Sequence, residues 1–371
     1  MRVLYLLSDY VSHRRAGEAN RRALALAGNE LVDEPSRAEV AVVHDEPVYF
    51  HTHRAALAGL APGVPVAAYC VVETDPAPPD FIAPLQGVDA VWTCSAFSAG
   101  LLSRGLLSQG LGEGGPPVSV APHVVARERF SRDDLVRVRR LLGDGPGEPP
   151  HTFYTICDGA NPRKNLPGLL RAYAALRGMR LRARADGRAP CRPSCRLVVK
   201  QYRHALDLSG LPGVVSLTSE FTDGEMAALH ALGDCYVSAH RAEAWGLGMS
   251  EAMAFGRPVV ATGYSGCLDF LDSSTAWLVP FRLEAISQDE LVRCPPFFTP
   301  GMRWAVADED ALARAMAEVL EHPEEARERG ARGAVRARDF AAAKVGRLLS
   351  QLLSQLLARH CSQPASRSPA N

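Results

Sequence analysis

The sequence predicts an α/β protein made of two Rossmann-like domains whose parallel sheets face a central cleft. Short runs rich in β-branched residues alternate with helical stretches along the whole chain, the pattern of parallel sheets covered by helices. Many of these runs end in polar residues. A segment at 143–150, GDGPGEPP, concentrates residues that break both helices and strands, and it marks the boundary between the domains.

The first half of the chain contains five expected strands. They are 3–7, 40–43, 64–72, 90–93 and 118–121. Helices at 18–27 and 97–107 connect them, and a charged helix at 132–142 follows. We therefore predict a first domain at 1–145.

The second half repeats this βα pattern with different residues. The expected strands are 153–157, 196–200, 214–217, 235–239, 258–262 and 276–281, and the expected helices are 166–176, 250–255 and 310–320. A capping box, Thr222-x-x-Glu225, predicts a further helix start. The Arg- and Gly-rich piece 178–193 is typical of a solvated insertion.

These elements predict a second domain at 151–340. A helix at 341–361 is expected to join the first domain, and 362–371 is expected to be a disordered tail.

The charge balance excludes one class of function. The chain of 371 residues has 41 basic and 41 acidic residues, whereas a dedicated nucleic-acid binder normally shows a basic surplus. Only three of the basic residues are lysines, Lys164, Lys200 and Lys344, which leaves 38 arginines. No apolar run approaches the length of a membrane span, and the scattered cysteines favour a reducing, cytoplasmic location.

The segment Glu243–Glu251, EAWGLGMSE, joins an expected strand to an expected helix. Its glycines allow close approach to a ligand, and the free N–H groups of the helix start suit a phosphate. The two glutamates can accept hydrogen bonds from sugar hydroxyls. Two surface glutamates, one of them near a helix N-terminus, would explain the same spacing.

A second segment, DGANPRK at 158–164, also runs from a strand toward a helix. Arg163 and Lys164 are there in position to bind a diphosphate, and Lys200 ends the next strand. Two of the three lysines in an Arg-rich chain therefore fall at neighbouring strand ends, which favours phosphate contacts over a solvated surface. A third segment, TGYSGCLDF at 262–270, offers backbone groups to the same ligand.

These segments resemble glycosyltransferase family 4, the glycosyl transferases group 1, which are retaining enzymes of the GT-B fold. The resemblance rests on RKN at 163–165, VVK at 198–200, the stretch from Glu243 through GLGMSEAMAFGRPVVATGYSG, and WLVPF at 277–281. A weaker match covers VVETDPAPPDF, AVWTCSAFSAGLL and VSVAPH in the first half.

The resemblance implies roles for individual residues. Lys164 would neutralise the diphosphate of a nucleotide-sugar donor, with help from Arg163 and Lys200, and Glu243 would lie beside the donor sugar. The remaining donor-site residues that the resemblance implies are Trp245, Gly246, Leu247, Gly248, Glu251 and, in the loop after the first strand, Gly17.

The resemblance also implies a mechanism without a protein nucleophile, in which the leaving diphosphate takes the proton of the acceptor. Positioning and charge stabilisation are then the tasks of the protein. No cofactor and no metal is expected. The acidic pair at Asp308 and Asp310 is better explained as a helix N-cap.

The acceptor is expected at the strand ends of the first domain. Five acidic residues follow three of its strands: Asp9, Asp45, Glu46, Glu73 and Asp75. An acidic pocket favours a small amine-bearing acceptor, such as an aminocyclitol in antibiotic biosynthesis, and a UDP-linked donor is expected.

Two alternatives remain open at this stage. Arginines around the first helix, at positions 14, 15, 21 and 22, would suit a polysaccharide or lipid-glycan transferase at a membrane face, although membrane association is not favoured. From another class, the fold would also suit a nucleotide-binding module or an isomerase. A dehydrogenase is disfavoured because no G-x-G-x-x-G follows a strand.

Overall fold

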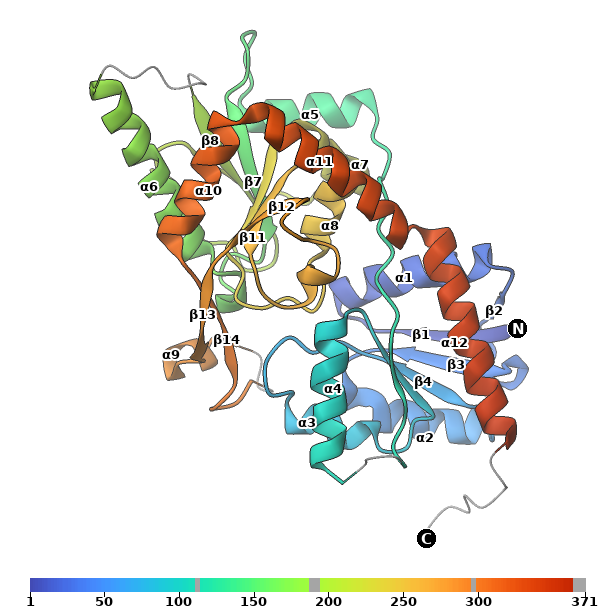
Figure 1. The fold of residues 1–371 in the computed structure, drawn as a ribbon. Helices are drawn as coiled ribbons and strands as arrows, with labels where there is room; N and C mark the ends of the chain where they lie inside the picture. Colours follow the sequence, from blue (N-terminus) through green and yellow to red (C-terminus); the bar gives the residue numbers. More distant parts are fainter. Residues whose placement is uncertain (111–113, 187–193, 295–297, 363–371) are drawn as a thin grey trace. The chain divides into compact units, whose positions relative to one another are not determined.

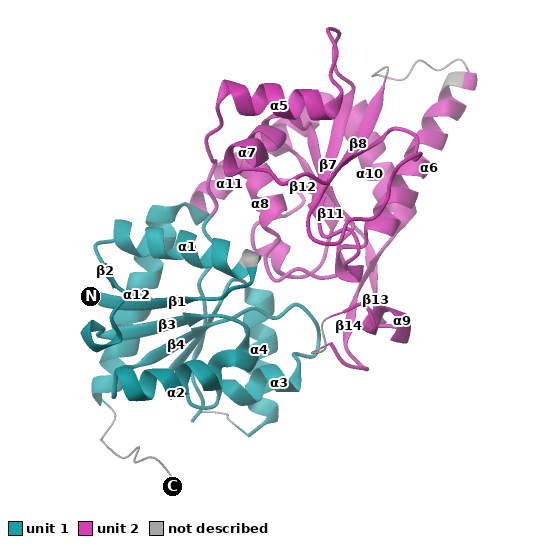
Figure 2. Ribbon diagram, turned by 180° about the vertical axis from the view of Figure 1, so that it is seen from behind, with its two compact units in different colours: residues 1–124, 340–371 teal, residues 125–339 magenta. Residues whose placement is uncertain are grey.

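The computed structural model describes residues 1–110, 114–186, 194–294 and 298–362, and the chain divides into two compact units (Figures 1 and 2). Unit 1 combines Met1–Val124 with Phe340–Asn371, and unit 2 is the continuous stretch Val125–Asp339. Unit 1 is therefore built from both ends of the chain.

Unit 1 contains a six-stranded parallel sheet with the strand order β2-β1-β3-β4-β5-β6. The strands are β1 (Arg2–Leu7), β2 (Glu30–Val32), β3 (Val40–His44), β4 (Val66–Tyr69), β5 (Ala90–Thr93) and β6 (Val118–Val120). Its helices are α1 (Val11–Leu26), α2 (Phe50–Leu60), α3 (Pro79–Ile82), α4 (Ala96–Ser108) and α12 (Ala342–Ser362).

Unit 2 contains a second six-stranded parallel sheet, in the order β12-β11-β10-β7-β8-β9. Its strands are β7 (His151–Cys157), β8 (Cys195–Gln201), β9 (Val214–Leu217), β10 (Cys235–Ser238), β11 (Val259–Thr262) and β12 (Ala276–Val279). Its helices are α5 (Arg132–Leu142), α6 (Leu166–Ala185), α7 (Asp223–Leu232), α8 (Leu247–Ala254), α9 (Gln288–Leu291), α10 (Glu309–Glu321) and α11 (Pro323–Ala337). An antiparallel hairpin of β13 (Phe281–Ala285) and β14 (Arg303–Ala307) completes it.

The main core of unit 2 lies between its sheet and two helices. Leucines of α6 and α10, with Tyr173 and Met316, pack on Phe153, Val199 and Val237 from three neighbouring strands. Both helices are apolar on the side that faces the sheet, which buries these side chains and fixes the strand ends beside them. The rigid sheet edge is what positions the loops described below.

The predicted fold class is confirmed in its sheets and in much of its helical pattern. The capping box at Thr222 and Glu225 forms at the start of α7, and Asp308 caps α10 by accepting a hydrogen bond from the N–H of Ala311. The solvated insertion predicted at 178–193 is wrong for its first part because α6 continues to Ala185, and 187–193 lies outside the described residues.

Two segments near the expected domain boundaries have clear packing partners. Helix α5 lies within the first domain predicted from the sequence, but it packs on α7 and belongs to unit 2. Helix α12 packs along α1 in unit 1. Of the tail expected at 362–371, Ser362 still ends α12, and the remainder lies outside the described residues.

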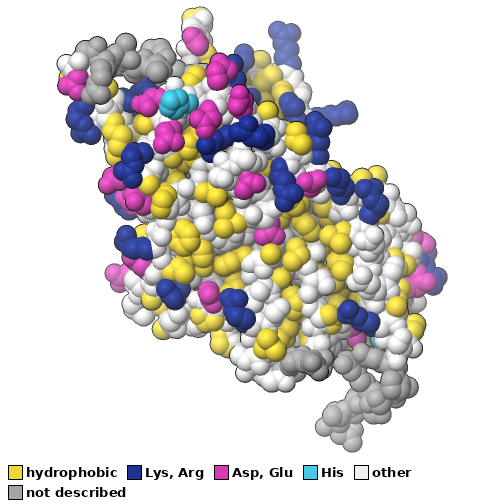
Figure 3. All heavy atoms as spheres, viewed as in Figure 1, with side chains coloured by type: hydrophobic (Ala, Val, Ile, Leu, Met, Phe, Trp, Pro, Cys, Tyr) yellow, Lys and Arg dark blue, Asp and Glu magenta, His cyan; other side chains and the backbone are white. Residues whose placement is uncertain are grey.

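The surface carries mixed charge. On the part of the face described in Figure 3, basic and acidic side chains are interspersed and do not form the single basic stripe of a nucleic-acid binder. Among the described helices, none is both long enough and apolar enough to cross a membrane.

Candidate active site

The candidate site lies at the carboxyl end of β7 and β10 in unit 2. The chain runs outward from β7 to β8 and β9 and then returns to place β10 on the other side of β7. At such a reversal the loops that follow the two neighbouring strands run to opposite sides and leave a crevice between them. Ligands of open α/β sheets bind in this crevice. The loop after β7 carries Arg163 and Lys164, and the loop after β10 carries Glu243.

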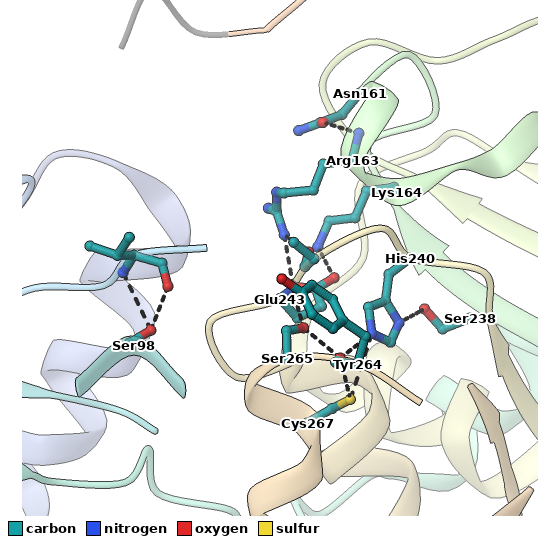
Figure 4. Close-up of polar contacts among 12 residues, drawn as sticks. Ser98, Asn161, Arg163, Lys164, Ser238, His240, Glu243, Tyr264, Ser265 and Cys267 are labelled. Carbon is teal, nitrogen blue, oxygen red and sulfur yellow. Dashed lines mark hydrogen bonds and ion pairs between the residues drawn. The ribbon is translucent and has the colours of Figure 1, made fainter. Parts of the chain in front are cut away.

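Three charged side chains meet at this point (Figure 4). The ammonium group of Lys164 donates to Oε1 of Glu243 at 2.5 Å, and Nη1 of Arg163 donates to Oε2 at 2.9 Å. The same Arg163 nitrogen donates to the carbonyl oxygen of Ala242 at 2.8 Å. All three side chains are at least four-fifths buried, so the charges interact strongly.

The pKa values follow from this arrangement. Burial alone would raise the pKa of Glu243, but the charges of Lys164 and Arg163 outweigh it and lower the pKa to about 2. Burial and Arg163 would lower the pKa of Lys164, yet Glu243 raises it above its ordinary value. The carboxylate and the ammonium group are therefore both charged around neutral pH.

We expect the ionisation of Glu243 not to affect the pH dependence of kcat/KM between pH 5 and 9. A glutamate with a lowered pKa stays ionised above its ordinary value of 4.5, and its ion pairs are lost only as the pH falls toward 2. The ratio of kcat/KM between the wild type and Glu243→Gln should stay constant across this range. A ratio that changes tenfold within it would contradict the assigned pKa.

Hydrogen bonds to backbone carbonyl groups hold the loop after β7 and the loop after β10 together. Asn165 adopts the left-handed conformation (φ 49°), and its side-chain amide donates to the carbonyl of Ala239 at 3.0 Å. The N–H of Arg241 donates to the carbonyl of Arg163 at 2.8 Å. These bonds fix the cations and the carboxylate relative to each other before any ligand binds.

The loop after β11 adds a second support, which the sequence did not reveal. The hydroxyl of Ser265 accepts a hydrogen bond from the N–H of Glu243 at 2.8 Å, and the N–H of Gly266 donates to the carbonyl of Glu243 at 2.9 Å. Ser265 reaches this position with φ 74° and ψ −155°, a backbone region that normally requires glycine. The backbone is therefore strained at Ser265, the residue that forms a hydrogen bond with the N–H of Glu243.

His240 supports the loop after β11 by contacting Tyr264. Its ring is fully buried, with Nδ1 3.1 Å from the hydroxyl of Ser238 and Nε2 3.1 Å from the carbonyl of Tyr264. Since a carbonyl only accepts, Nε2 carries the proton, and burial lowers the pKa of this histidine to about 4.

We expect Ser265→Gly to lower kcat about tenfold without lowering stability, because it removes one hydrogen bond to Glu243 and relieves the backbone strain. Ser265→Ala removes the same hydrogen bond but keeps the strain, so its kcat should fall equally while its free energy of unfolding decreases. Steady-state kinetics and chemical denaturation of both variants test this. Unchanged kcat in both would show that Ser265 does not position Glu243.

The glycine-rich turn leads into α8 as expected. Gly246 has φ 101°, and a side chain at Gly248 would clash with the hydroxyl of Tyr236, so both positions need glycine for packing as well. The Trp245 indole is buried and donates to the hydroxyl of Ser250 at 3.1 Å, which leaves only its backbone for a ligand. Leu247 begins α8.

Two residues that were predicted to bind the donor, Glu251 and Lys200, have close partners within unit 2. Oε2 of Glu251 lies 3.4 Å from Nε2 of the buried His230. Lys200 is buried, donates to the carbonyl of Gln201 at 2.8 Å and lies over the ring of Phe221. The structure thus brings Lys164, Arg163 and Glu243 together and directs Lys200 elsewhere.

The predicted position of Gly17 is wrong. It lies inside α1 rather than in a loop, and a side chain there would meet Leu7 of β1 at 2.3 Å. Close packing of the helix on the strand explains this glycine. Helix α1 begins at Val11, after a residue whose side chain makes no capping hydrogen bond, so no N-cap signal marked its start.

The five expected acceptor residues do follow β1, β3 and β4, which are neighbours in the sheet of unit 1. Two of them form ion pairs within the unit, Asp9 with Arg14 and Asp75 with Arg104. Asp45 is buried, with Oδ2 2.9 Å from Nε2 of His53. Burial would raise the pKa of Asp45, but hydrogen bonds from His53 and Ser8 keep it below its ordinary value. Glu46, the next residue in the chain, and Glu73, after β4, are half-buried.

Within the described residues, no group of three or more His, Cys, Asp or Glu is arranged to hold a metal ion. The expectation of a reaction without metal remains a prediction.

Comparison with known proteins assigns the unit that carries this site. Residues 151–294 match the family described as glycosyl transferases group 1. The chain carries a glycosyltransferase domain. Lys164, Arg163, Glu243 and Ser265 all lie inside the matched region of this domain. No curated protein sequence matches the chain.

Solved structures agree on the fold of the chain. Anabaena HepE in complex with UDP-glucose has 13% identity and a TM-score of 0.65, over 96% of this chain and 100% of that chain. Sucrose-phosphate synthase from Thermosynechococcus elongatus has 17% identity and a TM-score of 0.60, over 96% and 99%. A UDP-forming α,α-trehalose-phosphate synthase from Burkholderia xenovorans, in complex with glucose-6-phosphate, has 14% identity and a TM-score of 0.62, over 94% and 79%. The fold is GT-B.

Proposed function

We propose that this protein transfers a sugar, with retention of configuration, from a UDP-sugar to a hydroxyl of a small amine-bearing acceptor such as an aminocyclitol. The ion-paired cluster of Lys164, Arg163 and Glu243 at the β7/β10 reversal carries the proposal. The UDP-glucose bound to the HepE structure supports the choice of donor.

The two cations are suited to the diphosphate of the donor. Lys164 supplies a compact charge and Arg163 a planar fork, and both are already desolvated and fixed by the loop contacts. Charge that develops on the diphosphate as the glycosidic bond breaks is then stabilised without rearrangement of the site.

Glu243 is suited to stabilise positive charge and poorly suited to act as a nucleophile. Its two oxygens already accept hydrogen bonds from two cations, and its pKa of about 2 makes it a weak base. In the proposed reaction the bond from the anomeric carbon to the diphosphate oxygen breaks. The acceptor oxygen bonds to that carbon on the same face, and its proton passes to the diphosphate. This sequence explains retention without a covalent enzyme intermediate.

The amine-bearing acceptor is supported by the buried carboxylate of Asp45 at the end of β3. A carboxylate whose pKa is below its ordinary value stays ionised and attracts an ammonium group. Because Asp9 and Asp75 are paired with arginines, the acidic set is less negative than five carboxylates suggest, and Asp45 becomes its central residue.

A product assay tests the proposal. Wild-type protein is incubated with UDP-glucose, UDP-GlcNAc or GDP-mannose, and with 2-deoxystreptamine, myo-inositol or a lipid-linked sugar. We expect UDP release that depends on 2-deoxystreptamine, and an α-linked product by NMR. Transfer only to the lipid-linked sugar would contradict the acceptor, and a β-linked product would contradict retention.

A further inference from the structure

A second group of polar side chains lies at the carboxyl end of the unit 1 sheet, all of them buried except the half-buried His13, and the proposed donor chemistry does not use it. It comprises Tyr5 of β1, His44 of β3, Tyr69 of β4, His13 and Asn20 of α1, and His123 after β6. His44 is 1% exposed, and its ring centroid lies 4.1 Å from that of Tyr69 and 5.9 Å from that of His13.

The hydrogen bonds within this group determine the tautomer of His44. The amide nitrogen of Asn20 donates to the hydroxyl of Tyr5 at 3.1 Å, and that hydroxyl lies 3.0 Å from Nδ1 of His44. Because this hydroxyl already accepts from Asn20, it satisfies both bonds by donating a hydrogen bond to Nδ1 of His44, so Nδ1 is the acceptor and Nε2 carries the hydrogen.

Two nitrogen atoms of this group then lack a partner. Nε2 of His44 and Nδ1 of His13 are both buried and form no hydrogen bond. An unsatisfied buried donor is unfavourable and requires an explanation. A single oxygen about 2.9 Å from each nitrogen can bridge rings at this separation.

We propose that His44 and His13 form a subsite for an uncharged hydroxyl group of the acceptor ring. Nε2–H of His44 donates a hydrogen bond to the hydroxyl oxygen, and Nδ1 of His13 accepts a hydrogen bond from the hydroxyl group. A hydroxyl matches this pair because it both donates and accepts, whereas an ammonium group only donates and an ionised phosphate only accepts.

The electrostatics of the group agree with an uncharged ligand. Burial lowers the pKa of His13 to about 4 and that of His123 to about 3, and it holds the pKa of His44 well below its ordinary value. The imidazoles are neutral at pH 7 and attract no anion. The charge of Asp45 acts on His13, so we expect one acceptor ring to place an amine at Asp45 and a hydroxyl at the histidines.

This subsite rests on the proposed function for its biological ligand, but histidine NMR tests it without any turnover. Protein labelled with ¹⁵N-histidine is titrated, in the presence of UDP, with glucose, glucose-6-phosphate, myo-inositol and 2-deoxystreptamine. We expect Nδ1 of His44 to be unprotonated in the free protein. At least one of these compounds should shift the His44 and His13 signals. If none of the four shifts either signal, water alone occupies the site and the subsite is refuted.

Steady-state kinetics with the compound that binds provides a second test. His44→Phe should raise the KM for this compound at least about tenfold, the effect of one lost hydrogen bond. His44→Gln should recover part of the loss because its amide keeps a donor. His151→Phe, a buried histidine at the start of β7, is the matched control.

The outcomes separate the two proposals. An unchanged KM in His44→Phe overturns the subsite while UDP-sugar turnover still supports the transferase. Shifted histidine signals without any UDP-sugar turnover support the subsite and overturn the donor. Should His44→Phe fail to fold, the wild-type titration and His44→Gln still decide the question.

Discussion

Glu243→Gln is expected to lower turnover at least about a hundredfold, the scale on which enzymes respond to the loss of one preorganised charge. The neutral amide keeps the shape of the side chain but removes the charge that balances Lys164 and Arg163. It also removes the negative charge that stabilises the sugar as it becomes positive. Steady-state release of UDP from the preferred UDP-sugar measures the effect.

Lys164→Ala should reduce turnover by a similar factor, because the diphosphate loses its closest point charge and Glu243 loses one ion-pair partner. Glu290→Gln is the matched control, since Glu290 is similarly buried in unit 2 and pairs with Arg241 at 2.8 Å. Circular dichroism should show all three variants folded. Near wild-type turnover in Glu243→Gln and Lys164→Ala would overturn the site assignment.

Gly346→Ala is expected to destabilise the protein by about 2 kcal/mol or more, the range of overpacked contacts. A β-carbon at Gly346 of α12 would lie 2.0 Å from the carbonyl oxygen of Ala23 in α1. The backbone of α12 fixes the position of the β-carbon, and the carbonyl oxygen belongs to the backbone of α1, so no side-chain rotation relieves the clash. The two helices must separate, which exposes their shared apolar face.

Gly59→Ala is the control, for which we expect a gain in stability instead of a loss. Gly59 lies in α2, and a β-carbon there meets no atom within 4 Å, so alanine should stabilise the helix by up to about 1 kcal/mol. Chemical denaturation of both variants gives the two free energies of unfolding. Equal stability of Gly346→Ala and the wild type would contradict the close approach of α12 to α1.

The sequence was sufficient to predict which residues of unit 2 carry charge at strand ends. Lys164 and Glu243 both follow strands whose apolar runs are unmistakable, and the fold confirms those strands. The sequence could not show that β7 and β10 are neighbours, because strand order is a property of the assembled sheet. That adjacency is what joins the two residues in an ion pair.

Other features depended on packing that no local pattern records. Ser265 stands in a region of backbone space that favours glycine, and only its bond to the N–H of Glu243 explains it. Arg14 lies on α1 and Arg104 on α4, so the ion pairs that they form with Asp9 and Asp75 were not visible in the sequence either. Helix α11 and the β13–β14 hairpin were also not predicted from the sequence.

The discontinuity of unit 1 has a consequence for synthesis on the ribosome. Residues 1–124 emerge first, but the helix that covers α1 is the last described element of the chain to be made. The nascent N-terminal part must keep an apolar surface exposed while Val125–Asp339, which is continuous, emerges and folds as a unit. Translation arrested before residue 340 should therefore leave unit 2 folded and unit 1 dependent on chaperones.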